Sequence, residues 1–202
     1  MFLRPQSAAL VLLAALTLAC DGRGSQSISP SSPSSVVSPS ALNASPATRA
    51  SQEGGIGQEI KMFDACDPET FNAALGPGTC IRNGGVRFDM FLELLKRHRS
   101  IGSWHFTPPQ GTLSVGQELV AANHGGETHT FTEVDEFGGG IVAMLNNLTG
   151  LTAVAPECNQ LAPGDFIQPG GSFRETEDNS GVEKYQCCIH PWMRAEIRVI
   201  ER

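Results

Sequence analysis

The chain has 202 residues, of which 40% are hydrophobic and 17% are charged, and its formal net charge at pH 7 is −7. This length allows one domain with a substantial apolar core plus additional segments. No run of basic residues is present, so nucleic acid is not an expected partner, and the acidic surface favours protein partners with a basic docking patch.

Residues 1–20 have the pattern of an export signal. Arg4 supplies the positive start, and the apolar run 8–18 is shorter than the ~20 residues that a membrane span needs. A small residue before Cys20 resembles a bacterial lipobox, in which the cysteine is lipidated, although Thr17 stands where lipoboxes usually carry leucine. The alternative is an ordinary secretory signal with a chance cysteine. Both interpretations predict an exported protein.

Residues 21–55 are rich in serine, proline and alanine and contain almost no large apolar side chains. Such a segment cannot bury enough surface to offset the entropy of ordering it, so we expect a disordered linker. An anchor followed by a tether predicts a domain that is lipid-anchored through Cys20 and works on the periplasmic or cell-surface side of the membrane.

Residues 56–100 form a helix-containing extension. In "VRFDMFLELLKRHR" the apolar residues Phe88, Phe91, Leu92 and Leu95 recur at helical spacing, and basic residues occupy the last turn, where the helix dipole favours them. The sequence leaves two roles open for this extension, because it is suited either to cover a sheet edge or to dock a partner.

Residues 101–202 contain short β-rich segments separated by glycine and proline turns: "SWHF", "LSV", "ELVAANH", "THTFTEV", "EKYQCC" and "AEIRVIE". Short strands with regular turn signals predict an all-β sandwich or barrel.

The stretch "CCIHPWM" places Cys187, His190 and Met193 on one short loop. Soft sulfur ligands select Cu(I), and two histidines, one cysteine and a weak axial methionine form the blue-copper ligand set. His129, at the start of a predicted strand, supplies the second histidine. Taken singly, these residues also suit a disulfide, a surface histidine, core filling and a buried hydrogen-bonded histidine. Together, at these spacings, they favour copper.

The spacing Cys-x-x-His-x-x-Met before a strand, with the upstream "HTF" at 129–131, resembles the plastocyanin-like and amicyanin-like cupredoxins. The resemblance implies a Greek-key β-sandwich over residues 101–202 and one type 1 copper bound by His129, Cys187, His190 and Met193. It also implies that His190 is the ligand at the solvent edge.

The same resemblance implies that redox partners dock at an apolar patch of Pro191 and Trp192 beside His190. It implies further that Thr130 ties the two ligand loops together through backbone bonds. The chain departs from the family in the adjacent Cys188, in the segment 56–100 and in the long stretch 138–181.

Cys188 needs a role other than metal binding. Successive side chains on a strand point to opposite faces, so Cys188 faces away from a metal held by Cys187. With Cys20 and Cys187 assigned, four cysteines remain, and they allow three pairings. The favoured pairing combines the local loop closure Cys66–Cys80 with Cys158–Cys188.

The predicted function is single-electron transfer by a monomeric, exported blue copper protein. An enzyme of the multicopper class is not expected, because the chain has only five histidines and no His-x-His cluster. The alternative is a periplasmic copper-handling protein that stores copper or delivers it to an oxidase.

Overall fold

The computed structural model describes residues 55–202. The predicted export signal 1–20, with Cys20, lies outside the described residues, as does the predicted linker 21–55 except for its last position. Among the residues that are described, no helix is both long and apolar enough to cross a lipid bilayer.

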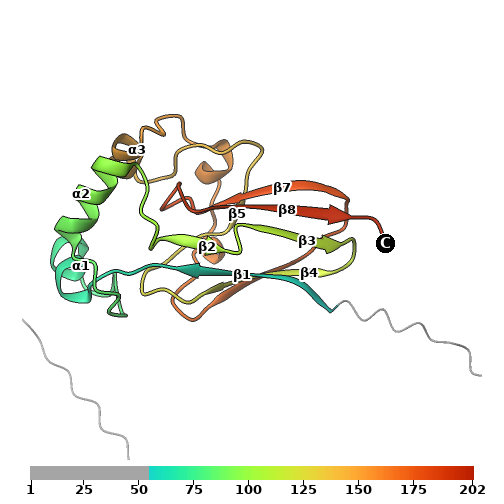
Figure 1. Ribbon diagram of the computed structural model, residues 1–202, viewed down its shortest axis with the longest axis horizontal. Helices are drawn as coiled ribbons and strands as arrows, with labels where there is room; N and C mark the ends of the chain where they lie inside the picture. The colour runs from blue at the N-terminus through green and yellow to red at the C-terminus, as the bar shows by residue number, and fades with distance from the viewer. Residues whose placement is uncertain (1–54) are drawn as a thin grey trace, which may run out of the picture. The chain divides into compact units, whose positions relative to one another are not determined.

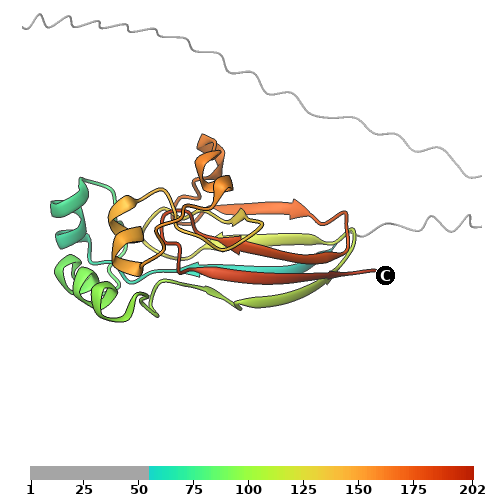
Figure 2. The ribbon, with the colours of Figure 1, turned by 90° about the horizontal axis from the view of Figure 1, so that it is seen from above.

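Two four-stranded sheets make up the body of the domain (Figure 1, Figure 2). The first has the strand order β2-β1-β4-β6, formed by His105–Thr107, Ile56–Phe63, Glu118–Asn123 and Ser172–Thr176. The second has the order β3-β8-β7-β5, formed by Gln110–Ser114, Arg194–Ile200, Gly181–Gln186 and Thr132–Glu133. The pairs β1–β4 and β3–β8 are parallel, which requires crossover connections. The predicted all-β sandwich with additional helices is confirmed.

Alternating burial along the strands defines the core between the sheets. In β8, Ala195, Ile197 and Val199 are buried and the residues between them are exposed, so one face of the strand lies against the first sheet. From the first sheet, Ile60 and Met62 of β1 are fully buried in the same apolar cluster. This rigid core is the scaffold on which the connecting loops are held.

The predicted boundary after residue 100 does not separate an extension from the sandwich, because strand β1 is part of the first sheet. β1 lies inside the first sheet, between β2 and β4, although the sequence assigned its residues to an extension. Its parallel partner β4 begins 62 residues later, at Glu118, so no local pattern reveals the pairing. The additional segment is an insertion between β1 and β2.

This insertion carries two helices. Helix α1, Pro68–Leu75, begins with the Asp67 side chain accepting the Thr70 N–H at 3.0 Å, an N-cap that satisfies an otherwise unpaired donor. Helix α2, Phe88–His98, is the predicted helix, and it buries Phe91 and Leu95.

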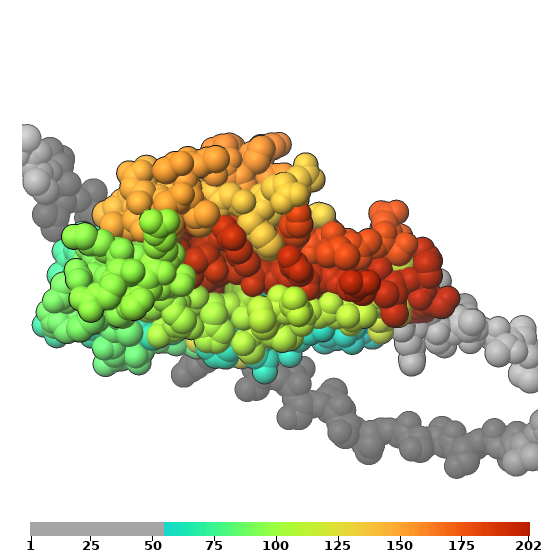
Figure 3. Space-filling view, turned by 45° about the horizontal axis from the view of Figure 1, so that its top comes forward, coloured from blue at the N-terminus to red at the C-terminus, as the bar shows by residue number. Residues whose placement is uncertain are grey.

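Helix α3, Ala143–Thr149, and two short 3-10 helices, Pro156–Asn159 and Pro163–Asp165, lie in the long connection between β5 and β6. In both ribbon views, α1, α2 and α3 gather at the end of the sandwich opposite the C-terminus (Figure 1, Figure 2). On the face in Figure 3, the green atoms around α2 and the orange atoms of the α3 connection cover the same end. The helices therefore enclose the end where the predicted metal ligands lie.

Candidate metal centre

Three of the predicted ligands converge at this helical end of the sandwich. Cys187 follows β7 directly and His190 lies in the turn before β8, while His129 precedes β5 and is fixed by reciprocal backbone hydrogen bonds with Ile167 at 3.1 and 2.7 Å. The Cys187 Sγ lies 3.8 Å from Nδ1 of His129 and 3.7 Å from Nδ1 of His190. The three residues are 0%, 0% and 3% exposed, for Cys187, His129 and His190 respectively.

These separations suit a single metal ion. A thiolate binds a metal such as zinc at about 2.3 Å and an imidazole nitrogen at about 2.0–2.1 Å. With tetrahedral or trigonal angles, those bond lengths place sulfur and nitrogen roughly 3.6–3.8 Å apart. The donor atoms of His129, Cys187 and His190 have that spacing. One thiolate and two imidazoles are also the donors that copper takes in electron-transfer sites, so the residues present fit copper.

Met193 is held in the same turn by the backbone. Its N–H donates to the His190 carbonyl at 2.9 Å, and its carbonyl accepts the Cys187 N–H at 3.0 Å. The side chain is 1% exposed and packs in the main core cluster. A role for Met193 as the weak fourth ligand stays a prediction, supported by its place in this closed turn.

The Cys187 sulfur accepts two backbone hydrogen bonds, from the N–H groups of Thr130 and His190, each at 3.4 Å. Burial alone would raise the pKa of the Cys187 thiol, but hydrogen bonds and charge from His129 and His190 outweigh burial and hold the pKa well below its ordinary value. These contacts favour the thiolate at position 187, the form that binds metals.

Thr130 joins the two ligand loops, as the resemblance implied. Its hydroxyl oxygen accepts the Cys188 N–H at 2.8 Å, in addition to the contact between its own N–H and the Cys187 sulfur. Thr130 is fully buried, so these bonds are protected from water. They fix the loop that carries His129 to the loop that carries Cys187.

Asp64, at the end of β1, is a functional residue that the sequence analysis missed. Its carboxylate accepts the Nε2–H of His129 at 3.0 Å, and the two side chains are 1% and 0% exposed. The same carboxylate accepts backbone N–H groups of Gly126 at 2.8 Å and Glu127 at 3.0 Å. Because the Nε2–H group of His129 is held by Asp64, the other ring nitrogen, Nδ1, is directed at the Cys187 sulfur.

The same contacts shift the pKa values of Asp64 and His129. Burial alone would raise the pKa of Asp64, but the hydrogen bonds from His129 and the two backbone N–H groups lower it to about 2. Burial would likewise lower the pKa of His129, but Asp64 and the Cys187 thiolate raise it to about 9. Glycine is required beside this pair, because a Cβ at Gly125 would collide with the Asp64 carboxylate.

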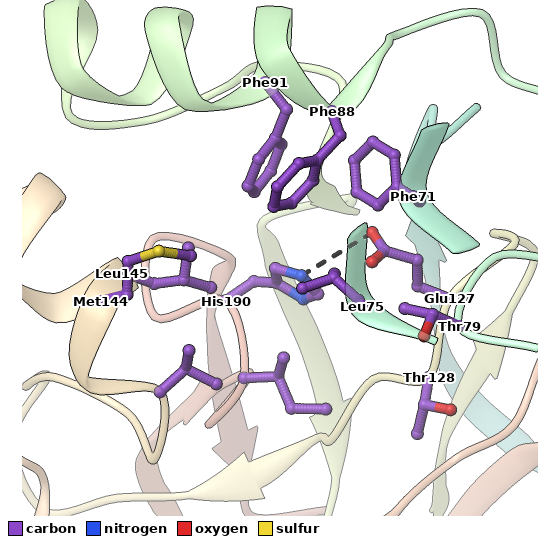
Figure 4. Close-up of a pocket in the computed structure, with 12 residues that line it drawn as sticks. Phe71, Leu75, Thr79, Phe88, Phe91, Glu127, Thr128, Met144, Leu145 and His190 are labelled. Carbon is purple, nitrogen blue, oxygen red and sulfur yellow. Dashed lines mark ion pairs between the residues drawn. The ribbon is translucent and has the colours of Figure 1, made fainter. Parts of the chain in front are cut away.

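A second carboxylate lies beside the other histidine. Glu127 accepts the indole N–H of Trp104 at 2.6 Å, and the same oxygen is 3.8 Å from Nε2 of His190 (Figure 4). Burial raises the pKa of Glu127, and the charge of His190 partly opposes this effect. Asp64 precedes the two inserted helices in the chain and Trp104 follows them, so one end of the insertion is bonded to His129 and the other to Glu127, which lies beside His190.

Both predicted disulfides are present. Cys66–Cys80 and Cys158–Cys188 have Cα–Cα separations of 6.1 and 5.4 Å. Cys188 packs in a separate small apolar cluster with Val134, so its side chain points away from the candidate metal centre, as strand alternation predicted. Within residues 55–202, Cys187 is the one free cysteine.

The expectation that His190 lies at the solvent edge is wrong. It is 3% exposed because the inserted helices cover it, and Pro191 next to it is also buried. Trp192 is half-buried and packs against Phe91 of α2, with ring centroids 6.1 Å apart. Docking at Pro191 and Trp192 stays a prediction, and Trp192 is the member of that pair that a partner would reach.

Comparison with known proteins gives structural similarities alone. No family model matches the chain, and no curated protein is detectably related to it. A purple cupredoxin from Nitrosopumilus maritimus is 21% identical, with a TM-score of 0.36, over 49% of this chain and 85% of that one.

Two amicyanin structures show a comparable level of similarity to this chain. One is a methionine-to-alanine mutant with Cu(I), and the other is a reduced proline-to-glycine mutant at pH 4. They are 18% and 19% identical over 50% of this chain and 77% of theirs, each with a TM-score of 0.34. Scores at this level carry no argument about the site, which therefore rests on its own distances and burial.

Proposed function

We propose that this chain is an exported type 1 copper protein that passes single electrons between redox partners. The observation that carries the proposal is the placement of two imidazole Nδ1 atoms 3.7 and 3.8 Å from one fully buried thiolate. His129, Cys187 and His190 would hold the ion, with Met193 as the weak fourth ligand. Bound copper would supply one-electron exchange between Cu(II) and Cu(I).

The protein's own contribution is to keep the ligands in place while the charge at the site changes. Backbone N–H groups of Thr130 and His190 point at the sulfur, and Asp64 fixes the ring of His129. These groups are held by the sheets and by two disulfides, so little has to rearrange when an electron arrives or leaves. Burial of the three donor residues excludes water from them.

The same burial argues against the alternative, a copper store or carrier. A carrier must hand its ion to an acceptor, which requires ligands that a second protein can reach. His129 and Cys187 are 0% exposed, and His190 is 3% exposed. A single buried thiolate between two fixed imidazoles suits an ion that stays bound, so no catalytic or delivery role is proposed.

The proposed location is the periplasmic or cell-surface side of a membrane, with lipidation at Cys20 as the proposed anchor. Two disulfides support an oxidising compartment, because disulfides are rare in reducing ones. Proposed partners are redox proteins with a basic surface, since the chain carries a net charge of −7.

A redox cycle in the presence of a chelator tests the proposal against copper delivery. The copper-loaded protein is reduced and reoxidised repeatedly while excess bicinchoninate, a Cu(I) chelator, competes for the ion. We expect the visible absorption band to bleach and return in every cycle, with no coloured chelate formed. Stoichiometric transfer of copper to the chelator during the first reduction would support a carrier instead.

A further inference from the structure

A cavity of about 330 Å³ opens between the three helices and the turn that carries His190 (Figure 4). Its roof consists of the rings of Phe71, Phe88 and Phe91, which pack on one another. Leu75 and Met144 line it as well, and they are 51% and 44% exposed, so the cavity has an open mouth. Its volume lies at the lower end of the range for small-molecule sites.

Two polar groups face this apolar space from the floor: Nε2 of His190 and the carboxylate of Glu127 (Figure 4). The residues are 3% and 5% exposed. Within residues 55–202, Nε2 of His190 has no partner closer than the Glu127 oxygen at 3.8 Å, which is too long for a hydrogen bond. The atom faces the cavity, where a ligand or water can supply the hydrogen-bond partner that the protein does not.

The other polar side chains of the cavity are already engaged. The Thr79 hydroxyl donates to the Gly76 carbonyl, and the Thr128 hydroxyl donates to the Gln168 side chain, each at 2.9 Å. Neither hydroxyl has a hydrogen left to donate, so the main recognition groups are His190 and the part of the Glu127 carboxylate that Trp104 leaves free.

A neutral group that both donates and accepts a hydrogen bond suits these two residues, and a hydroxyl is the smallest such group. A hydroxyl can donate to the Glu127 carboxylate while it meets Nε2 of His190 as acceptor or donor, whichever tautomer the ring has. A carboxylate or phosphate on the ligand would be repelled by Glu127, and an ammonium could not accept a hydrogen bond from His190. The three phenylalanine rings favour a flat aromatic body through edge and offset stacking.

We propose that this cavity binds a small aromatic molecule with a free hydroxyl group, of the phenol class. The ring lies beneath Phe71, Phe88 and Phe91, and the hydroxyl bridges Glu127 and His190. The site goes beyond electron transfer and needs no metal, because the cavity and its two polar groups belong to the protein alone.

A paired-ligand titration tests this inference. 4-Methylphenol and its methyl ether, 4-methylanisole, have nearly the same apolar body, but the ether has no hydrogen to donate. The readout is the indole N–H NMR signal of Trp104, which reports the Glu127 carboxylate that it contacts. The chain has two tryptophans, so a Trp192→Phe variant assigns the signal. We expect saturable binding of the phenol and binding of the ether weaker by on the order of tenfold.

Two variants locate the binding. Leu75→Trp at the mouth should abolish the shift, whereas Val182→Trp, at an equally exposed apolar position on β7, should leave it unchanged. Glu127→Gln should weaken phenol binding and bring its affinity close to that of the ether. Equal binding of phenol and ether, no saturable shift, or an unaltered titration in Leu75→Trp would each overturn the inference. The metal-free protein should give the same titration, so failure of the copper proposal is detected separately in the visible spectrum.

Discussion

Asp64 links the N-terminal strand to the candidate metal centre through one side chain. Its carboxylate is buried, ionised and fixed by backbone N–H groups, and it accepts the Nε2–H of His129. A fixed negative charge at this position favours the more highly charged state of a bound metal. It also keeps the ring of His129 in one orientation, with Nε2 protonated.

Replacing Asp64 by asparagine should raise the reduction potential of the copper-loaded protein. Loss of such a partner typically lowers metal affinity 10–100-fold, and we expect the loss to fall mainly on Cu(II). Each tenfold difference between the two affinities corresponds to about 59 mV, so the rise should be roughly 60–120 mV. Voltammetry measures it, with exposed Asp178→Asn as the matched control. A potential unchanged in Asp64→Asn would mean that the carboxylate does not act on the metal.

The sequence identified the candidate ligands, but it did not identify the carboxylate of Asp64 beside them. Cys187, His190 and Met193 lie on one turn, so covalent spacing alone places them together. Asp64 lies 65 residues before His129, and it carries no local signal that distinguishes it from other acidic residues. Only the pairing of β1 with β4 brings Asp64 to the site, and that pairing is a tertiary property.

At the scale of elements, a group of acidic residues lies at the connection between β6 and β7. Glu177, just after β6, is buried, and the Tyr185 hydroxyl lies 2.9 Å from the carboxylate of Glu183 of β7 and 3.3 Å from that of Glu177. The pKa of Glu177 is raised to about 7, mainly by burial and also by repulsion from the Glu183 carboxylate. The folded state therefore holds this proton more tightly than the unfolded state does.

Glu177→Gln should stabilise the protein at pH 8 and leave its stability unchanged near pH 4. A raised carboxyl pKa means that wild-type stability is complete below the unfolded value of 4.5 and falls as the pH rises to about 7. The amide of glutamine mimics the protonated carboxyl, so the variant does not lose stability as the pH rises. Its free energy of unfolding at high pH should exceed that of the wild type by about 1–3 kcal/mol. Urea unfolding at pH 4, 6 and 8 measures it, with exposed Glu196→Gln as control. A gain of equal size at all three pH values would contradict this assignment.

The disulfide Cys158–Cys188 ties the long connection between β5 and β6 to the strand end that carries Cys187. A variant with both cysteines changed to alanine should lose about 2–5 kcal/mol of stability. It should keep its copper and its visible band, because Cys188 faces a separate apolar cluster. Denaturant unfolding and absorption spectra test the two halves of this prediction. Loss of the band at full folding would show that Cys188 contributes to the metal centre.

Local patterns predicted six of the eight strands and helix α2, but they did not predict β1 as a strand, and they missed β6, α1 and α3. Strands such as β8 alternate apolar and polar residues, and α2 has clear helical spacing, so each is visible within its own residues. β1 was assigned to an extension because its neighbours in the sheet are distant in the sequence. The residues of β1 alone therefore do not show which sheet the strand belongs to.

At the scale of the whole domain, the insertion between β1 and β2 covers one end of the sandwich. Its helices lie with α3 at one end of the sandwich, over the turn that carries His190 (Figure 1, Figure 4). The sequence left open whether this segment covers a sheet edge or docks a partner. The structure shows that it encloses the candidate metal centre, which is why His190 is buried and not at the surface.

The most direct test of the account is the visible absorption spectrum of the purified protein after addition of one equivalent of Cu(II). We predict an intense blue band from charge transfer between the Cys187 thiolate and copper. Cys187→Ser should abolish this band, and Cys158→Ala/Cys188→Ala should retain it. A protein that stays colourless with Cu(II), or that binds zinc at this site in preference to copper, would contradict the central claim.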